Sequence, residues 1–299
     1  MIKILRETKE GDMQSNLFNY TTLSTRLEKS TRTLFVTLNR PDWNNAFRLE
    51  MLFELESLFA WCTSRVEINT IFIDSSTSEF SPGLDLDSLS SLSASQLDKI
   101  TTKLHKIIFS MMQLPQTVVV DMGDGSQTIA TEFAMGADVR IASKNAHISF
   151  NHCEFGLVPA AGGMSMLSTL VSPTFARSWV LSGKPISESA LLQSGFINQT
   201  YNSVSKTEII SELLYSIAKL APVQRIQAKL GLFENLRAQF ENGIVLDRKI
   251  AKASMVSEDW RTKKPNPESK DEGFMPAKSM SYSVKLSLIK SEEFSPTEH

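Results

Sequence analysis

Cysteine is scarce in this sequence: Cys62 and Cys153 are the only two among 299 residues. Two cysteines cannot build the disulfide framework of a small secreted domain or a cysteine-rich zinc site, so we expect two ordinary reduced thiols. No run of about 18 apolar residues exists that could span a membrane. Residues 1–12 lack the apolar stretch of a secretory signal. These absences favour a reduced, cytoplasmic protein without a membrane span.

An excess of charge of either sign is also missing, because 31 Lys+Arg face 33 Asp+Glu and leave a net charge of −2. This balance argues against a nucleic-acid partner. The four histidines show no metal-ligand spacing, so no metal site is expected. There is no phosphate loop, no GxGxxG and no GxSxG elbow. Their absence argues against NTPases, dinucleotide oxidoreductases and α/β-hydrolases.

The residues that are present are patterned as in a globular chain, with 41% apolar residues. Short β-branched or apolar runs predict strands at 33–38, 70–74, 117–120, 139–142 and 147–150. Apolar residues at steps of three and four predict helices. The predicted helices cover 45–64 (capped by Asn44 or Asn45), 97–111, 128–136, 164–170, 175–181, 187–193, 208–220 and 222–250. Strands alternate with helices early and helices dominate late, which predicts an α/β layer with a helical C-terminal part.

Composition divides the chain into four regions. Residues 1–16 are polar and are predicted to be an extension, 17–200 form the core, and 201–252 form a helical region. From residue 253 the sequence becomes charged and proline-bearing, most clearly at 263–272, and residues 253–299 are predicted to be a flexible tail. Alternation of apolar and polar residues at 282–288 is compatible with a short docked strand.

Five short segments, none of them specific by itself, follow one another in a recognisable order. They read NRP and NAF at 39–47, FSPGLDL at 80–86, Glu132 followed by ADVRIA at 137–142, FGLVPAAGG at 155–163, and LSGKPI at 181–186 with GFIN at 195–198. In this order and spacing, over about residues 18–250, the chain resembles the crotonase superfamily, the enoyl-CoA hydratase/isomerase family, as a divergent member.

This resemblance implies a crotonase-like α/β fold, in which a spiral of ββα units is followed by a helical C-terminal trimerisation region. It implies a homotrimer or homohexamer. It also implies an acyl-CoA thioester as substrate, with coenzyme A entering as part of that substrate and no separate cofactor.

The family holds the thioester oxygen between two backbone N–H groups, which stabilise the enolate as negative charge builds up. The resemblance assigns these donors to Leu84, just after Gly83, and to Ile129. The family's three glycines before the glutamate are replaced here by Thr128, Ile129 and Ala130. A bulky residue in place of glycine changes how closely a thioester can approach. The surrounding residues Pro82, Asp85 and Leu86 fall in the loop that the family uses to bind the coenzyme A thioester.

Proton transfer to or from the acyl chain needs acid/base groups, and many hydratases use two glutamates. Glu132 matches the first. His152 occupies the position of the second, and a histidine can transfer protons near neutral pH or serve as a hydrogen-bonded structural residue. If this segment is extended, Glu154 points to the same side as His152 and is an alternative. His147 is expected to be structural.

Two classes of function remain open from the sequence. The first is an enoyl-CoA hydratase/isomerase with Glu132 as acid/base, Leu84 and Ile129 as oxyanion donors and His152 as an auxiliary group. Relatives of the thioesterase or dehydratase kind that make fatty-acid signals belong to this class. The second is a non-catalytic homologue that binds acyl-CoA or a protein partner, which the lost glycines and the replaced second carboxylate favour.

Overall fold

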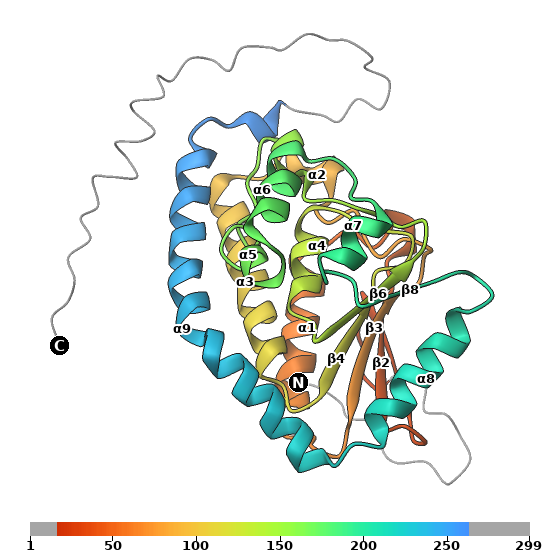
Figure 1. Cartoon of the computed structure of the whole chain (residues 1–299). Coiled ribbons are helices and arrows are strands. Elements are labelled where there is room, and N and C mark those ends of the chain that lie inside the picture. The colour runs from red at the N-terminus through yellow and green to blue at the C-terminus, as the bar shows by residue number, and fades with distance from the viewer. Residues whose placement is uncertain (1–16, 263–299) are drawn as a thin grey trace, which may run out of the picture.

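A central six-stranded sheet organises the molecule, and the computed structural model describes residues 17–262 (Figure 1). The strands, in chain order, are β1 (Leu23–Glu28), β2 (Thr33–Leu38), β3 (Thr70–Ser75), β4 (Thr117–Asp121), β5 (Gly125–Ser126), β6 (Val139–Ser143), β7 (His147–Ile148) and β8 (Gln199–Tyr201). The sheet order is β1-β2-β3-β4-β6-β8, and β5 pairs separately with β7. Only the β1–β2 pair is antiparallel; the other pairs are parallel.

Helices cover both faces of this sheet. The α-helices are α1 (Leu49–Cys62), α2 (Leu86–Leu89), α3 (Ala94–Gln113), α4 (Thr128–Met135), α5 (Leu167–Leu170), α6 (Pro173–Ser182), α7 (Glu188–Gln193), α8 (Lys206–Ala218) and α9 (Pro222–Met255). Short 3-10 turns lie at Pro41–Trp43, Asn151–Phe155 and Asp259–Arg261. The main core lies between the sheet and α1, α3 and α4, whereas α8 covers the opposite face (Figure 1).

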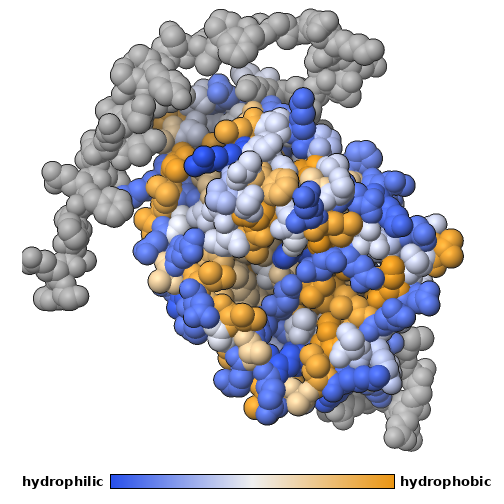
Figure 2. Space-filling view, in the orientation of Figure 1, coloured by the Kyte–Doolittle hydropathy of each residue, from blue (hydrophilic) through white to orange (hydrophobic). Residues whose placement is uncertain are grey.

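The helix α9 is the longest element, with 34 residues, and it runs along the outer side of α3 (Figure 1). Pro222 occupies its first turn, where the missing N–H costs nothing. Polar and apolar residues are intermixed over the face of the molecule that Figure 2 shows. Within residues 17–262, no helix is long and apolar enough to cross a membrane.

The predicted strands and helices are present, although 147–150 is a strand only at His147–Ile148 and 164–170 is a helix only at Leu167–Leu170. The structure makes three further corrections. The cap prediction for α1 is wrong: Asn44 and Asn45 have left-handed φ values of 46° and 59°, and the helix begins only at Leu49, after Arg48. The strands β1, β5 and β8 and the short helix α2 were not predicted. The region from residue 253 is not wholly a tail, because α9 continues to Met255 and Trp260 is 1% exposed with its indole N–H bonded to the Leu92 carbonyl.

The predicted extension at 1–16, the charged stretch at 263–272 and the strand at 282–288 lie outside the described residues.

Candidate active site

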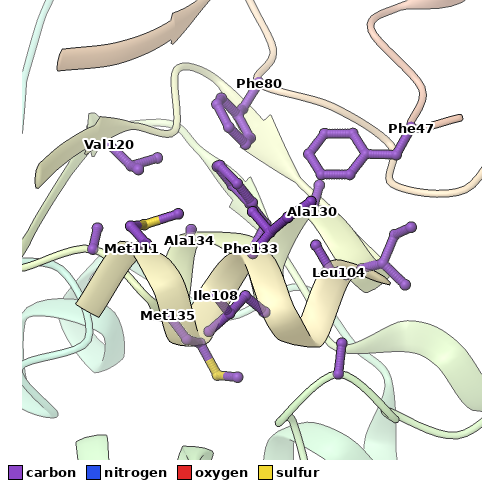
Figure 3. Packing of buried hydrophobic residues seen from close by; sticks show 14 of the residues in the cluster. Phe47, Phe80, Leu104, Ile108, Met111, Val120, Ala130, Phe133, Ala134 and Met135 are labelled. Carbon is purple, nitrogen blue, oxygen red and sulfur yellow. The ribbon is translucent and has the colours of Figure 1, made fainter. Parts of the chain in front are cut away.

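The short helix α4 is the buried foundation of the site. All eight of its residues are buried. The rings of Phe47 and Phe80 pack on Phe133 of α4, with centroids 5.5 Å and 6.1 Å away (Figure 3). On its other side, α4 packs against Leu104 and Ile108 of α3. This packing fixes the loop that follows Phe80 relative to the beginning of α4, so backbone groups of both segments are held in place.

Glu132 lies on α4, and its carboxylate is fully buried. Its Oε1 accepts hydrogen bonds from the backbone N–H groups of Ala161 and Gly163, both at 2.8 Å. Its Oε2 lies 3.0 Å from Nε2 of His152. A buried carboxylate requires such donors, because an unpaired charge in the interior is costly. Glu132 is therefore a fixed acceptor, and His152 is its side-chain partner.

His152 belongs to the 3-10 turn Asn151–Phe155 and is 1% exposed. This segment is not extended, so the expectation that Glu154 shares a side with His152 is wrong. Glu154 is exposed and accepts a hydrogen bond from Asn151. Within the described part of the chain, Nδ1 of His152 is buried and has no hydrogen-bond partner. The ring is thus held at one nitrogen and free at the other.

An apolar cavity opens beside His152. The space between its walls, counted together with the part that is open to solvent, is about 350 Å³. Its walls come from α3, from the end of α9 and from the loop before Ala161. The described lining residues are Leu84, Leu97, Ile100, Thr101, Ile129, His152, Leu157, Val158, Ala160, Ala251, Ser254 and Met255. Among these twelve residues His152 is the only titratable one, so the cavity suits an acyl chain with a single acid/base group at its wall.

The two predicted oxyanion donors border this cavity from neighbouring segments. Leu84 is 4% exposed and Ile129 is 2% exposed. Gly83 has a φ of 87°, a left-handed conformation that glycine adopts freely. A Cβ on Gly83 would lie 3.1 Å from the backbone nitrogen of Ile129, so the two segments approach closely. Within residues 17–262 the N–H of Ile129 makes no backbone hydrogen bond.

Thr128 fills the space between these segments. Its φ is 46°, a left-handed conformation that costs a β-branched residue on the order of 1–3 kcal/mol. Its fully buried hydroxyl donates to the Pro82 carbonyl at 3.1 Å, and its Oγ1 lies 3.4 Å from the N–H of Leu84. The sequence shows that a glycine is replaced here, but no local pattern reveals the left-handed backbone or the direction of the hydroxyl.

The remaining predicted binding residues lie on the same loop. The Pro82 carbonyl accepts the hydrogen bond from the Thr128 hydroxyl. Asp85 is 7% exposed, pairs with Arg48 at 2.5 Å and caps α2 through the N–H of Ser88. Burial opposes its charged form, but the hydrogen bond and charge of Arg48, the N–H of Ser88 and the charge of Arg40 together outweigh burial and lower the pKa of Asp85. The backbone of Leu86 begins α2, and its side chain is outside what the structure describes.

Two buried titratable groups behind Glu132 were not found from the sequence. Burial lowers the pKa of His105 on α3 to about 4, against the opposing charge of Glu132. Asp247 on α9 is fully buried and accepts a hydrogen bond from the Ser165 hydroxyl at 2.8 Å. Burial raises the pKa of Asp247 to about 7. Both residues sit in helical positions that read as ordinary core or surface, so no sequence signal marks them.

Comparison with known proteins agrees with this arrangement. The family model described as enoyl-CoA hydratase/isomerase matches residues 28–270. The 2,3-dehydroadipyl-CoA hydratase of Escherichia coli is 23% identical over 78% of this chain and 91% of its own length. The short-chain-enoyl-CoA hydratase of Clostridium acetobutylicum is 22% identical over 79% of this chain and 90% of its own length.

A solved structure shows the same fold. The crystal structure of the enoyl-CoA hydratase from Bacillus halodurans superposes with a TM-score of 0.75 at 17% identity, covering 81% of this chain and 98% of that one. The expected crotonase-like α/β fold with C-terminal helices is thereby confirmed.

Proposed function

Because the chain belongs to the enoyl-CoA hydratase/isomerase family, we propose that it binds an acyl-CoA thioester and moves a proton along the acyl chain. The observation that carries this proposal is the buried pair of Glu132 and His152 at the wall of an apolar cavity. The acyl chain occupies the cavity, and its α and γ carbons lie next to the imidazole.

The roles of the pair follow from its hydrogen bonds. Both oxygens of Glu132 are engaged, one by two backbone N–H groups and one by Nε2 of His152. A carboxylate accepts, so the neutral imidazole carries its proton on Nε2 and leaves a lone pair on Nδ1. His152 is then the base that contacts the substrate. Glu132 holds the tautomer and stabilises the imidazolium that forms.

The reaction that suits this arrangement is the shift of a carbon–carbon double bond. His152 Nδ1 takes a proton from C2 of a 3-enoyl thioester, and the electron pair moves into a dienolate with its charge on the thioester oxygen. The N–H groups of Leu84 and Ile129 stabilise that oxygen. The imidazolium, whose proton can exchange with solvent, then gives a proton to C4, which yields the 2-enoyl thioester and restores the neutral imidazole.

Hydration is less well served by this cavity. Adding water requires one group to activate the water and another to protonate the α carbon. The described lining contains one titratable residue, His152. A single base that removes and returns one proton needs no partner. We therefore place isomerisation ahead of hydration.

The test is turnover of a 3-enoyl-CoA and of a trans-2-enoyl-CoA by the wild type and two variants. Glu132→Gln keeps the acceptor for Ala161 and Gly163 but turns an amide N–H toward Nε2, which forces the imidazole proton onto Nδ1. We expect isomerisation to fall by about 10²-fold or more, with little change in acyl-CoA affinity. His152→Gln removes the base and should cost a similar factor.

Matched controls exist at a glutamate and a histidine outside the buried pair. Glu154→Gln and His147→Gln make the same chemical changes at exposed positions. Both should retain wild-type turnover. Full activity in His152→Gln would remove the histidine from the mechanism. Hydration faster than isomerisation by the wild type would contradict the choice between the two reactions.

A non-catalytic acyl-CoA-binding protein is the second candidate, and one observation favours it. The hydroxyl of Thr128 already lies beside the N–H of Leu84, where the thioester oxygen would be stabilised. Binding of all three acyl-CoA classes (saturated, 2-enoyl and 3-enoyl) without turnover or α-proton exchange would establish this candidate instead.

A further inference from the structure

Thr128 stands at a position where a side chain is not expected. It is the first residue of α4, it is fully buried, and its backbone is left-handed although the residue is β-branched. Such a conformation persists only where the surroundings hold it. Here the holding contact is the hydrogen bond that its hydroxyl donates to the Pro82 carbonyl at 3.1 Å.

The hydroxyl lies beside the first of the two N–H groups that a thioester oxygen would need. Thr128 Oγ1 lies 3.4 Å from the backbone nitrogen of Leu84. A Cβ placed on Gly83 would lie 1.9 Å from this oxygen and 3.1 Å from the backbone nitrogen of Ile129. The hydroxyl oxygen and the nitrogen of Ile129 therefore both lie close to Gly83, next to the segment that carries the N–H of Leu84.

We propose that the Thr128 hydroxyl closes the oxyanion site of the free protein by standing in for the thioester oxygen. A ligand carbonyl reaches the N–H groups of Leu84 and Ile129 only after this hydroxyl has moved. Thr128 is thus the residue that sets selectivity for a carbonyl group next to the sulfur. This inference rests on the proposed function, since it concerns the same site and the same class of ligand.

The proposal has a direct consequence for ligand selectivity. A thioester and the corresponding thioether differ only in the carbonyl oxygen. While the hydroxyl occupies the site, that oxygen gains little, because it reaches the donors only by displacing the hydroxyl from the Leu84 N–H and breaking its hydrogen bond to the Pro82 carbonyl. Replacing Thr128 by glycine removes the hydroxyl and also suits the left-handed backbone.

The experiment measures, by calorimetry, the dissociation constants of butyryl-CoA and of S-butyl-CoA for the wild type, Thr128→Gly and Thr128→Ser. The wild type and Thr128→Ser, which keeps a hydroxyl, should bind the two ligands within a factor of about 3. Thr128→Gly should bind the thioester at least about 10-fold more tightly than the thioether. Thermal unfolding of each variant checks that it is folded.

Two other results would overturn the closure. A wild type that already prefers the thioester by 10-fold, with no gain in Thr128→Gly, would show an open site. A loss of thioester affinity in Thr128→Gly would make the hydroxyl a third donor to the ligand. If neither ligand binds any of the three proteins, the proposed function fails. In that case a crystal structure of the free protein tests the closure separately. A Thr128 hydroxyl hydrogen-bonded to the Pro82 carbonyl would support the closure, and a hydroxyl turned away from it would overturn the closure.

Discussion

At the scale of single residues, the site is defined by what surrounds Glu132. Two backbone N–H groups and one imidazole saturate a carboxylate that has no access to water. Gly163 contributes one of these groups and lies so close that a Cβ on it would be 2.7 Å from Oε1 of Glu132 and 2.5 Å from Cβ of Pro159. The carboxylate is therefore positioned as much by a missing side chain as by a donor.

We expect Gly163→Ala to displace Glu132 and to uncouple it from His152. Turnover should fall by at least about 10-fold, because the tautomer and orientation of the imidazole are no longer fixed. The free energy of unfolding should drop by about 1–3 kcal/mol from overpacking. Gly231→Ala on α9 is the control, since nothing lies within 4 Å of a Cβ there and the helix should gain about 1 kcal/mol. Equal behaviour of both variants would refute this account of Gly163.

Asp247 gives a prediction about pH. Burial raises its pKa from 3.8 to about 7, so the folded chain holds this proton more tightly than the unfolded chain. The free energy of unfolding should therefore fall as the pH rises from about 4 to about 7, by up to about 4 kcal/mol from this group. Asp247→Asn keeps an acceptor for Ser165 and lacks the titration. Urea unfolding at pH 5 and pH 8 should show a smaller loss in the variant, and parallel losses would contradict the assignment.

The sequence predicted which residues form the site, but it did not predict which of them contact each other. The resemblance to the family placed Glu132 and His152 at the positions of its two catalytic glutamates. It could not show that the two side chains lie 3.0 Å apart. That contact depends on a 3-10 turn at Asn151–Phe155, where the sequence is equally compatible with a strand. The left-handed backbone of Thr128 was equally invisible, because β-branched residues avoid that region.

At the scale of elements, helices with strong apolar periodicity and strands with buried apolar runs could be predicted from the sequence. The helix α3 carries apolar residues at every third or fourth position and a capping box formed by Ser93 and Gln96, and its prediction is confirmed. The strand β8 has only three residues and pairs with β6 far away in sequence, so no local signal marks it. The beginning of α1 was misplaced because Asn44 and Asn45 form turns before the helix instead of capping it.

The end of α9 forms one wall of the cavity. Ala251 and Met255 line it, and Ala251 is 4% exposed. Ala251→Leu should fill part of this space and weaken binding of a long acyl-CoA by about 10-fold or more, while a four-carbon acyl-CoA is affected little. Val256→Leu on the next turn is the control, since Val256 is 51% exposed. Equal weakening for both chain lengths would place the acyl chain elsewhere.

At the scale of the whole molecule, several large apolar side chains remain at the surface of this single chain. Leu232 on α9 is 70% exposed, and Leu181 at the end of α6 is 79% exposed. The family resemblance predicts a homotrimer or homohexamer. Sedimentation should then give three or six times the 33.4 kDa of one chain. Leu232→Asp should shift this assembly toward the monomer, and Val204→Asp, at a 90% exposed position, should not. A monomer at micromolar concentration would contradict the prediction.

The central claim is that the His152–Glu132 pair removes a proton from a carbon next to a thioester. The most direct test is exchange of the α protons of a saturated acyl-CoA with deuterated water, followed by mass spectrometry, because it needs no double bond and no product release. The account predicts exchange by the wild type, and a rate about 10²-fold lower or less in both His152→Gln and Glu132→Gln, with Glu154→Gln unchanged. Binding without any exchange by the wild type, or undiminished exchange in His152→Gln, would contradict it.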